Sequence, residues 1–346
     1  MTLSLDQVGT AWEERPRHLP HAASFALADV SLDVAGDDAA LFDELAVVLG
    51  PPRPANTPRA RLRAEVRAVD PPESFGHLRL DAGTEDQLAP SDFLLGLLSP
   101  EFPFHLVAPH SSWTQLAFRG QERPAFALRG RDCLFGTDAR WRTAVSLFLF
   151  QRLMRLRADA VFFHASTVAI GGRGVMIVGA KGAGKSTLAL ALAARGVPLL
   201  GDENACYVPA RHELVPFLRP LGVKPGPRAA GVSEALARLG RDPDREGPAR
   251  IPADALFPAN APVPVPLRAV VFLEPFGPEP RLARVEPGRV ELAALQPVGS
   301  SLVNAPAAQR VFEMARLLAS AEVFRLWPGD PDATAVFVQR ELGAAS

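Results

Sequence analysis

The sequence predicts an α/β fold, with a strand-rich region at the N-terminus followed by a sheet core flanked by helices. Three observations support this prediction. Short apolar runs broken by proline-rich turns fill residues 1 to about 140, a pattern typical of antiparallel strands. The later part alternates strand-like apolar runs with runs of helical periodicity. Between one such strand and the next helix lies the glycine-rich stretch GAKGAGKS, residues 179–186.

Length and composition fit a globular protein of about two domains. The 346 residues are 48% hydrophobic and 22% charged, which is enough to form a sizeable core. The formal net charge of −1 lacks the basic excess of nucleic-acid-binding proteins. Two cysteines without metal-type spacing exclude a disulfide scaffold. We see neither a signal peptide nor an apolar run of membrane-spanning length, so we expect a cytoplasmic protein that binds no nucleic acid and no membrane.

The N-terminal region is expected to form a meander of short strands. The segments TQLAFRG (114–120) and PAFALRG (124–130) indicate neighbouring strands. We therefore predict a strand-rich N-terminal domain of unknown role over residues 1–140 and a second domain over 141–346.

A helix is predicted over residues 138–159, with Asp138 as its N-cap. Its apolar side chains recur at helical spacing. They are Val145, Phe148, Leu149 and Leu153.

The segments around the glycine-rich stretch predict a strand, loop, helix and strand in sequence. AVFFHASTVAI (160–170) is predicted as one strand, joined by the turn GGRG to a second strand, VMIVG (175–179). The helix after the loop is expected to run through Ala194 and to stop at Gly196. VPLL (197–200) is the next short apolar strand.

The C-terminal part returns to the same alternation after an irregular segment. Residues 241–267 are proline-rich and aperiodic, and we expect a long loop there that closes over the site as a lid. The sheet pattern resumes with RAVVFLEP from Arg268. A helix over 306–321, the strand EVFRLW (322–327) and a helix from Pro331 complete the chain.

The stretch GAKGAGKS fits the P-loop pattern G-x-x-x-x-G-K-[ST]. Glycines let successive backbone N–H groups point inward at an anion, and the following helix adds its partial positive charge. The lysine reaches the β- and γ-phosphates, and the serine hydroxyl binds Mg²⁺. The predicted phosphate-binding residues are Gly179, Ala180, Lys181, Gly182, Ala183, Gly184, Lys185, Ser186 and Thr187.

Lysine is rare in this chain, so its positions are informative. Of the 37 lysines and arginines, only Lys181, Lys185 and Lys224 are lysines. Lys185 occupies the fixed lysine position of the motif. Its compact ammonium can reach the β- and γ-phosphates in a way that the planar guanidinium of arginine does not replicate. Lys181 is either a solvent-facing residue or an auxiliary phosphate contact.

Residues 164–203, HASTVAIGGRGVMIVGAKGAGKSTLALALAARGVPLLGDE, resemble the catalytic core of the HPr kinase/phosphorylase family. In that family a histidine begins a strand, a hairpin leads into the P-loop, and an acidic pair closes the next strand. His164, the loop and the pair Asp202 and Glu203 match these features without a gap. The chain is similar to HPr-kinase-related proteins found beside peptide-modification genes.

The resemblance implies a P-loop kinase core of the type shared with phosphoenolpyruvate carboxykinase, and an ATP-dependent serine kinase that uses Mg²⁺. It also implies a homo-oligomer that assembles through the catalytic domain, residues 141–346.

Roles follow from the chemistry of hydroxyl phosphorylation. Asp202, at the end of a strand beside the P-loop, is the predicted base for the acceptor hydroxyl. Glu203 is the predicted metal ligand together with Ser186. His164 either stabilises phosphate charge as an imidazolium or, when neutral, holds Asp202 in place. Lys224 is predicted to reach the transferred phosphoryl group or the substrate.

The leading prediction is therefore a kinase that transfers the γ-phosphoryl group of ATP to a hydroxyl group. The predicted acceptor is a serine of a peptide or small protein, for example a modified-peptide precursor. Two alternatives stay open. One is a kinase for a small-molecule hydroxyl. The other is a P-loop ATPase that acts as a switch on a partner.

Overall fold

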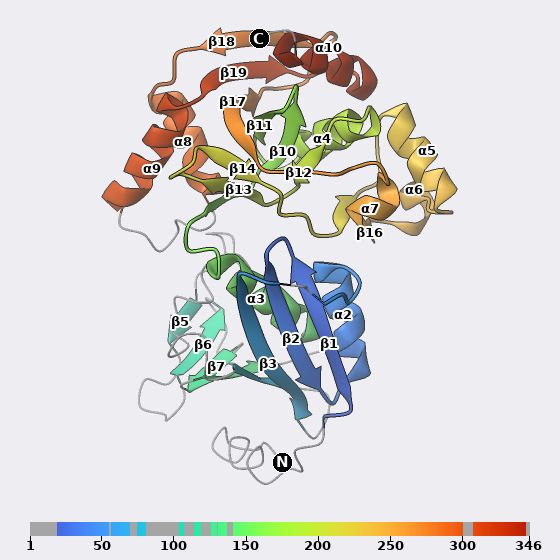
Figure 1. Cartoon of the computed structure of the whole chain (residues 1–346), viewed down its shortest axis with the longest axis vertical. Helices are drawn as coiled ribbons and strands as arrows, with labels where there is room; N and C mark the ends of the chain where they lie inside the picture. Colours follow the sequence, from blue (N-terminus) through green and yellow to red (C-terminus); the bar gives the residue numbers. More distant parts are fainter. Residues whose placement is uncertain are drawn as a thin grey trace. The chain divides into compact units, whose positions relative to one another are not determined.

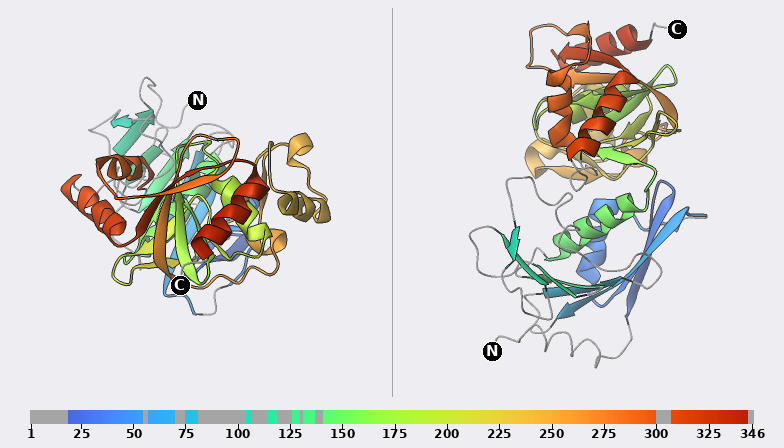
Figure 2. Two further views of the ribbon diagram at one scale, coloured as in Figure 1. Left: turned by 90° about the horizontal axis from the view of Figure 1, so that it is seen from above. Right: turned by 90° about the vertical axis from the view of Figure 1, so that its left-hand side faces the viewer.

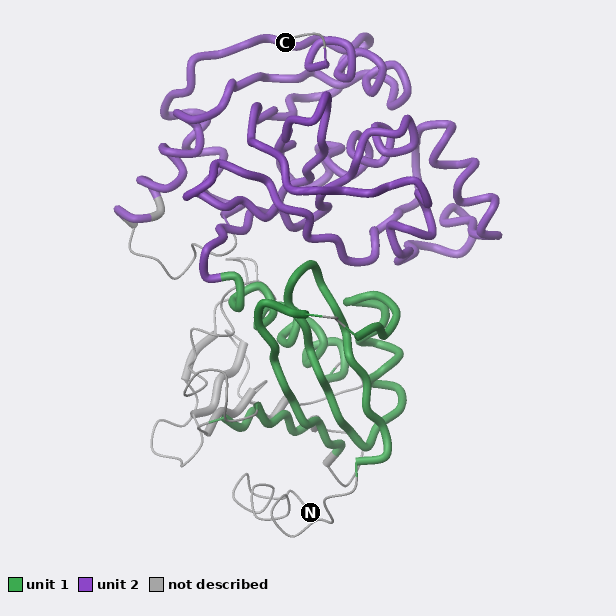
Figure 3. The backbone as a smooth tube through the Cα atoms, in the orientation of Figure 1, with its two compact units in different colours: residues 1–157 green, residues 158–346 purple. Residues whose placement is uncertain are grey.

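The computed structural model describes residues 19–54, 57–69, 75–80, 104–106, 114–118, 126–129, 131–136, 141–299 and 307–343. The chain forms two compact units, residues 1–157 and 158–346 (Figure 3). Both combine helices with β-sheet, so the α/β class predicted from the sequence is confirmed. The division falls after Arg157. The helix that begins at Trp141 is thus part of the first unit, whereas the sequence analysis placed it in the second.

Unit 1 contains one eight-stranded sheet in the order β1-β2-β3-β4-β8-β7-β6-β5 (Figure 1). Neighbouring strands are antiparallel except for the parallel pair β2 and β3. The expected pairing of the segments near 114 and 126 is confirmed by β6 and β7. The elements are β1 (His21–Leu27), β2 (Val30–Gly36), α2 (Ala39–Leu49), β3 (Ala60–Val69), β4 (Phe75–Leu80), β5 (Phe104–Leu106), β6 (Thr114–Phe118), β7 (Phe126–Arg129), β8 (Asp132–Gly136) and α3 (Trp141–Arg155).

Helices α2 and α3 pack against each other and against one face of this sheet (Figure 2). The apolar stripe predicted for α3 is confirmed, since its four side chains are fully buried. Each such side chain contributes roughly 1.5–3 kcal/mol by leaving water. The expected N-cap, Asp138, lies outside the described residues.

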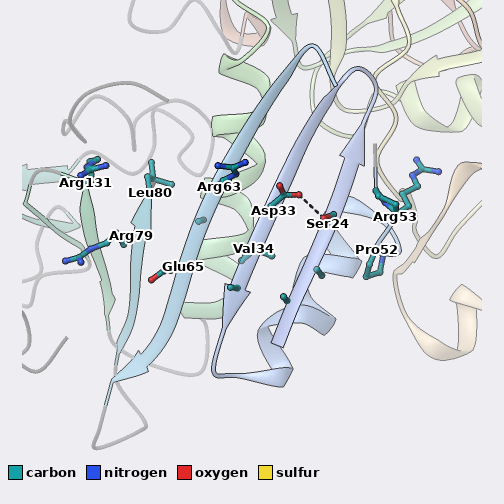
Figure 4. Close-up of a pocket in the computed structure, with 15 residues that line it drawn as sticks. Ser24, Asp33, Val34, Pro52, Arg53, Arg63, Glu65, Arg79, Leu80 and Arg131 are labelled. Carbon is teal, nitrogen blue, oxygen red and sulfur yellow. Dashed lines mark hydrogen bonds between the residues drawn. The ribbon is translucent and has the colours of Figure 1, made fainter. Parts of the chain in front are cut away.

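The face of the sheet opposite these helices carries a hollow of about 720 Å³ (Figure 4). Charged side chains that line the hollow form hydrogen bonds with neighbouring side chains. Asp33 accepts a hydrogen bond from Ser24 Oγ at 2.7 Å, and the Nε of Arg79 donates to Asp132 Oδ1 at 2.7 Å. The hollow carries none of the P-loop residues, so we do not assign the predicted chemistry to it.

Unit 2 contains a nine-stranded sheet, with the path β12-β10-β11-β17-β14-β13-β9 and with β19 and β18 added beyond β17. Strands β11, β17 and β19 run parallel. Its elements are β9 (Val161–Phe163), β10 (Ser166–Ile170), β11 (Arg173–Val178), α4 (Lys185–Ala194), β12 (Leu199–Gly201), β13 (Ala205–Val208), β14 (Glu213–Val215), β15 (Leu221–Val223), α5 (Ala230–Arg238), α6 (Pro243–Glu246), β16 (Ala249–Ile251), α7 (Ala253–Leu256), β17 (Val265–Leu273), β18 (Arg281–Val285), α8 (Arg289–Leu295), α9 (Ala307–Ala319), β19 (Glu322–Trp327) and α10 (Pro331–Gly343).

The sheet of unit 2 is covered by helices on both faces, as the alternation along β11 shows. Val175 and Ile177 belong to a core shared with α4, α5 and α10. Met176 and Val178 belong to a second core, shared with α8 and α9. Successive side chains of a strand point to opposite faces, so β11 is clamped from both sides. This fixes the position of the glycine-rich loop that follows it.

Two predictions for unit 2 are wrong. The segment 160–170 forms two strands, because β9 pairs with β13 whereas β10 pairs with β11 and β12. The chain therefore breaks at His164, between them. Residues 241–267 are not a long loop, since they contain α6, β16 and α7, and β16 pairs with β15. Ile251 and Leu256 of this segment are buried in the core.

No helix within the described residues has the length and apolarity needed to cross a membrane.

Candidate active site

The loop between β11 and α4 has the backbone geometry that anion binding requires. Gly182 and Gly184 adopt φ values of +86° and +94°, in the left-handed region that favours glycine. Gly184 is the N-cap of α4 and has no side chain to cap the helix. The first N–H groups of α4 are therefore left for a ligand, at the helix end with partial positive charge. All the predicted phosphate-binding residues, 179–187, lie in this loop and the first turn of α4.

Lys185 is buried and closes the loop on itself. Its Nζ donates to the carbonyl oxygens of Gly179 at 2.8 Å and Ala180 at 3.2 Å. An ammonium has three donors, so one donor remains for a ligand at the mouth of the loop. The other loop lysine, Lys181, is exposed and faces solvent.

Asp202 lies directly after β12 and joins three elements. Its Oδ1 accepts hydrogen bonds from Ser186 Oγ of α4 at 2.8 Å and from Ser166 Oγ of β10 at 2.6 Å. Only 4% of the residue is exposed. The second carboxylate oxygen, Oδ2, accepts no hydrogen bond from the described residues. A buried acceptor without a protein donor is free to accept from an ordered water or to bind a ligand.

Burial raises the pKa of Asp202, and the two serine hydroxyls counter part of this effect. The same loss of water lowers the pKa of Lys185, while the negative charges of Asp202 and Glu203 raise it. Burial thus disfavours the charged form of each group, and the neighbouring hydroxyls and charges offset only part of this effect.

The Glu203 carboxylate pairs with two arginines and makes no hydrogen bond with Ser166 or Ser186. Its backbone adopts φ +61°, which turns the chain sharply after Asp202. Its Oε2 pairs with Arg219 and with Nη1 of Arg250, the latter at 3.1 Å. Burial alone would raise the pKa of Glu203, but the two guanidinium groups outweigh it and hold the pKa below its usual range. The carboxylate therefore stays ionised and engaged.

His164 lies in the break between β9 and β10, with an exposed ring. Its Nδ1 is 3.2 Å from the backbone carbonyl oxygen of Glu203. A carbonyl only accepts, so Nδ1 carries the hydrogen and Nε2 presents a lone pair. Partial loss of water around the ring lowers the pKa of His164, and the positive charge of Lys185 lowers it further. The neutral ring is therefore favoured.

Lys224 follows β15 and is brought to the same region. Its positive charge contributes to the lowered pKa of Lys185, so the two ammonium groups are close enough to interact. Lys224 is exposed and makes no ion pair within the described residues. The nearby Arg228 is instead engaged with Asp244, at 2.8 Å.

The structure thus brings His164, Lys185, Asp202, Glu203 and Lys224 together around the loop. Three contributors escaped the sequence analysis. Ser166 had only one signal, a hydroxyl in a largely apolar strand, and Arg219 and Arg250 had none among the many arginines of this chain.

The donor set fits Mg²⁺ rather than a metal held by protein side chains alone. Within the described part of the chain, no three His, Cys, Asp or Glu side chains gather as a metal site. Mg²⁺ prefers oxygen ligands and commonly takes one or two from the protein, with substrate phosphates and water completing the shell. The Ser186 hydroxyl and Oδ2 of Asp202, which accepts no hydrogen bond from the described residues, provide such oxygens beside the glycine-rich loop.

Comparisons with known proteins add little. No family model matches the chain, and no curated protein matches it. Among solved structures, the chain is similar to the Hpr(Ser) kinase/phosphatase from Coxiella burnetii, with a TM-score of 0.26 and 15% sequence identity over 52% of this chain and 95% of that chain. This likeness is weak and does not indicate a function.

Replacing each of the two neighbouring acids is predicted to change the free energy of unfolding at neutral pH in opposite directions. The folded pKa of Glu203 lies below its ordinary 4.5, so its charge stabilises the fold above that pH and the stabilisation is lost as pH falls. Glu203→Gln should lower the free energy of unfolding at neutral pH, by on the order of 1–3 kcal/mol. The folded pKa of Asp202 lies above its ordinary 3.8, so its charge opposes folding at neutral pH. Asp202→Asn should therefore stabilise the protein.

Urea unfolding of both variants in EDTA, between about pH 2 and pH 8, tests this pair. Both differences from wild type should shrink toward the acid end. A destabilised Asp202→Asn at neutral pH, or a Glu203→Gln deficit that does not change with pH, would contradict the arrangement.

Proposed function

We propose that the protein is an ATP-dependent kinase that transfers the γ-phosphoryl group to a hydroxyl, a serine of a peptide or small protein. One observation carries the proposal. Beneath a P-loop with an uncapped helix start, the Ser186 hydroxyl donates to a buried carboxylate whose other oxygen has no donor among the described residues. This combination of anion nest, hydroxyl and carboxylate suits a metal-bound nucleoside triphosphate.

Phosphate binding falls to the loop, to the α4 N-terminus and to Lys185. The backbone N–H groups and the remaining ammonium donor of Lys185 would hold the β- and γ-phosphates. Ser186 and Asp202 would hold Mg²⁺, whose chemistry when bound is to neutralise charge on those phosphates. This assigns the metal to Asp202, whereas the sequence analysis gave it to Glu203. The ion pairs of Glu203 with Arg219 and Arg250 are the reason for the change.

His164 is then the better base for the acceptor hydroxyl. Its ring is exposed, its Nδ1 is fixed by the Glu203 carbonyl, and its Nε2 is left as an acceptor. In the reaction, the acceptor oxygen forms a bond to the γ-phosphorus, the bond from that phosphorus to the bridging oxygen of ADP breaks, and the hydroxyl proton passes to Nε2. Asp202 has both a buried position and two hydroxyl partners, which leave it poorly accessible to a peptide serine.

Lys224 would act on the far side of the transferred group. It is exposed, extends from the end of β15 and interacts electrostatically with Lys185. An exposed ammonium at this place can neutralise charge on the phosphoryl group as it moves to the acceptor.

The two loop lysines provide a matched test of nucleotide binding. Lys185→Met keeps the side-chain volume but removes every donor, so the increase in melting temperature caused by Mg·ATP should be lost. Lys181→Met removes the same charge from the exposed side of the loop and should retain most of that increase. Equal shifts in both variants, measured by thermal denaturation with and without Mg·ATP, would exclude the P-loop assignment.

Replacing the proposed base separates transfer from binding. His164→Gln keeps a hydrogen-bonding side chain of similar reach but cannot take a proton at neutral pH. ATP affinity should stay within about twofold of wild type, while phosphoryl transfer falls by about 10²-fold or more. Transfer is measured as incorporation of radiolabelled γ-phosphate into a serine-containing peptide library. Unchanged transfer in the variant would exclude His164 as base, and ATP hydrolysis by the wild type without transfer to any peptide would favour the ATPase alternative.

A further inference from the structure

An exposed aromatic ring lies beside the phosphate loop, and the mechanism above does not use it. Phe276 follows β17, the strand parallel to β11, and 60% of it is exposed. Large apolar side chains left in water next to a concave polar site commonly mark a contact for a ligand.

The backbone around Phe276 is held on both sides of the ring. The N–H of Glu274 donates to the carbonyl of Leu326, and the N–H of Gly277 donates to the carbonyl of Pro328, both at 2.8 Å. The Glu274 carboxylate also pairs with Arg325 at 3.3 Å. These contacts tie the segment after β17 to the end of β19, so the ring is presented on a fixed support.

The ring meets the P-loop at a glycine. A Cβ added to Gly184 would lie 3.1 Å from Cζ and 3.8 Å from Cε1 of Phe276. The edge of the ring therefore approaches the backbone at the start of α4, where a Cβ at position 184 would crowd it. With this edge against the loop and most of the residue in water, the ring surface stays open beside the phosphate nest.

The place of Phe276 in the sheet suits a base rather than a phosphate. Ligands of open α/β sheets bind outside the carboxyl ends of the parallel strands. Here β11 ends in the phosphate loop, and the neighbouring β17 ends at the segment that carries Phe276. The aromatic residue at the end of the next strand, β19, is Trp327. The guanidinium carbon of Arg281 lies 3.7 Å from the centroid of its ring, so this ring already has a partner.

We propose that Phe276 is the stacking surface for the base of the nucleotide whose phosphates the loop holds. This inference rests on the proposed nucleotide binding and adds to it the residue that recognises the base. Stacking on a phenyl ring depends on the π-face that every base has, and purines offer the larger face. The site should therefore bind ATP and GTP with similar affinity and bind pyrimidine nucleotides more weakly.

The test compares a full nucleotide with its phosphate chain alone. Isothermal titration of the full-length protein with ATP and with inorganic tripolyphosphate, each with Mg²⁺, should show tighter binding of ATP to the wild type. Phe276→Ala should weaken ATP binding by about tenfold or more, because it removes the ring on which the base stacks. Tripolyphosphate has no base, so its binding should stay unchanged. Phe276→Trp keeps an aromatic face and should restore ATP affinity to near the wild-type level.

The outcomes distinguish this inference from the function on which it rests. If the wild type binds neither ATP nor tripolyphosphate, the proposed function fails and this inference fails with it. If both ligands bind but Phe276→Ala leaves ATP affinity unchanged, or weakens both ligands equally, then phosphate binding stands and the stacking role is overturned. Equal affinity of the wild type for ATP and tripolyphosphate would overturn it as well.

Discussion

The site depends on one buried oxygen, Oδ1 of Asp202, which accepts hydrogen bonds from the hydroxyls of Ser166 and Ser186. These two bonds join β10, the residue after β12 and the first turn of α4. The loop between β11 and α4 is therefore anchored beneath its helix end as well as by the strand that leads into it. Hydrogen bonds to a charged acceptor are stronger than those between neutral groups, so these two bonds help to fix the start of α4 relative to the sheet.

That anchor places a carboxylate where water is scarce, and the surrounding charges make this possible. Burial disfavours ionisation of Asp202, while Lys185 lies close enough for the two opposite charges to support each other. The second acid, Glu203, instead pairs with Arg219 and Arg250. Two adjacent acids therefore have different partners. Asp202 accepts from the hydroxyls of β10 and α4, whereas Glu203 binds the arginines and, through its backbone carbonyl, orients His164.

The elements of the core could be predicted from the sequence wherever the pattern was local. Hydrophobic periodicity and the residues that start and stop helices were enough to predict several elements. These are the P-loop, the helix after it, the strands at VPLL and RAVVFLEP, and the last helix. The break at His164 could not be predicted, because a run of apolar residues looks the same whether it pairs with one neighbour or, as here, with different neighbours on either side of a kink. The ordering of 241–267 was missed for a related reason. Prolines mark turns but say nothing of Ile251 and Leu256, which are buried by residues distant in the chain.

Within the site, residue identity could be predicted better than residue role. The motif and the acidic pair located Lys185, Ser186, Asp202 and Glu203, and all four lie around the loop. Which acid faces the serine depends on the left-handed backbone at Glu203, a conformation that few residues other than glycine adopt and that the sequence does not signal. Ser166 and Arg250 enter through strand pairing across long sequence separations, which a single sequence does not reveal.

We propose that Asp202 and Ser186 hold the metal of a bound nucleotide. The most direct measurement is the affinity for ATP of the wild type and of Asp202→Asn, each with saturating Mg²⁺ and again in EDTA. We expect the substitution to weaken Mg·ATP binding by about 10–100-fold and to have little effect on binding of metal-free ATP. If Asp202→Asn binds Mg·ATP as tightly as the wild type, Asp202 does not hold the metal.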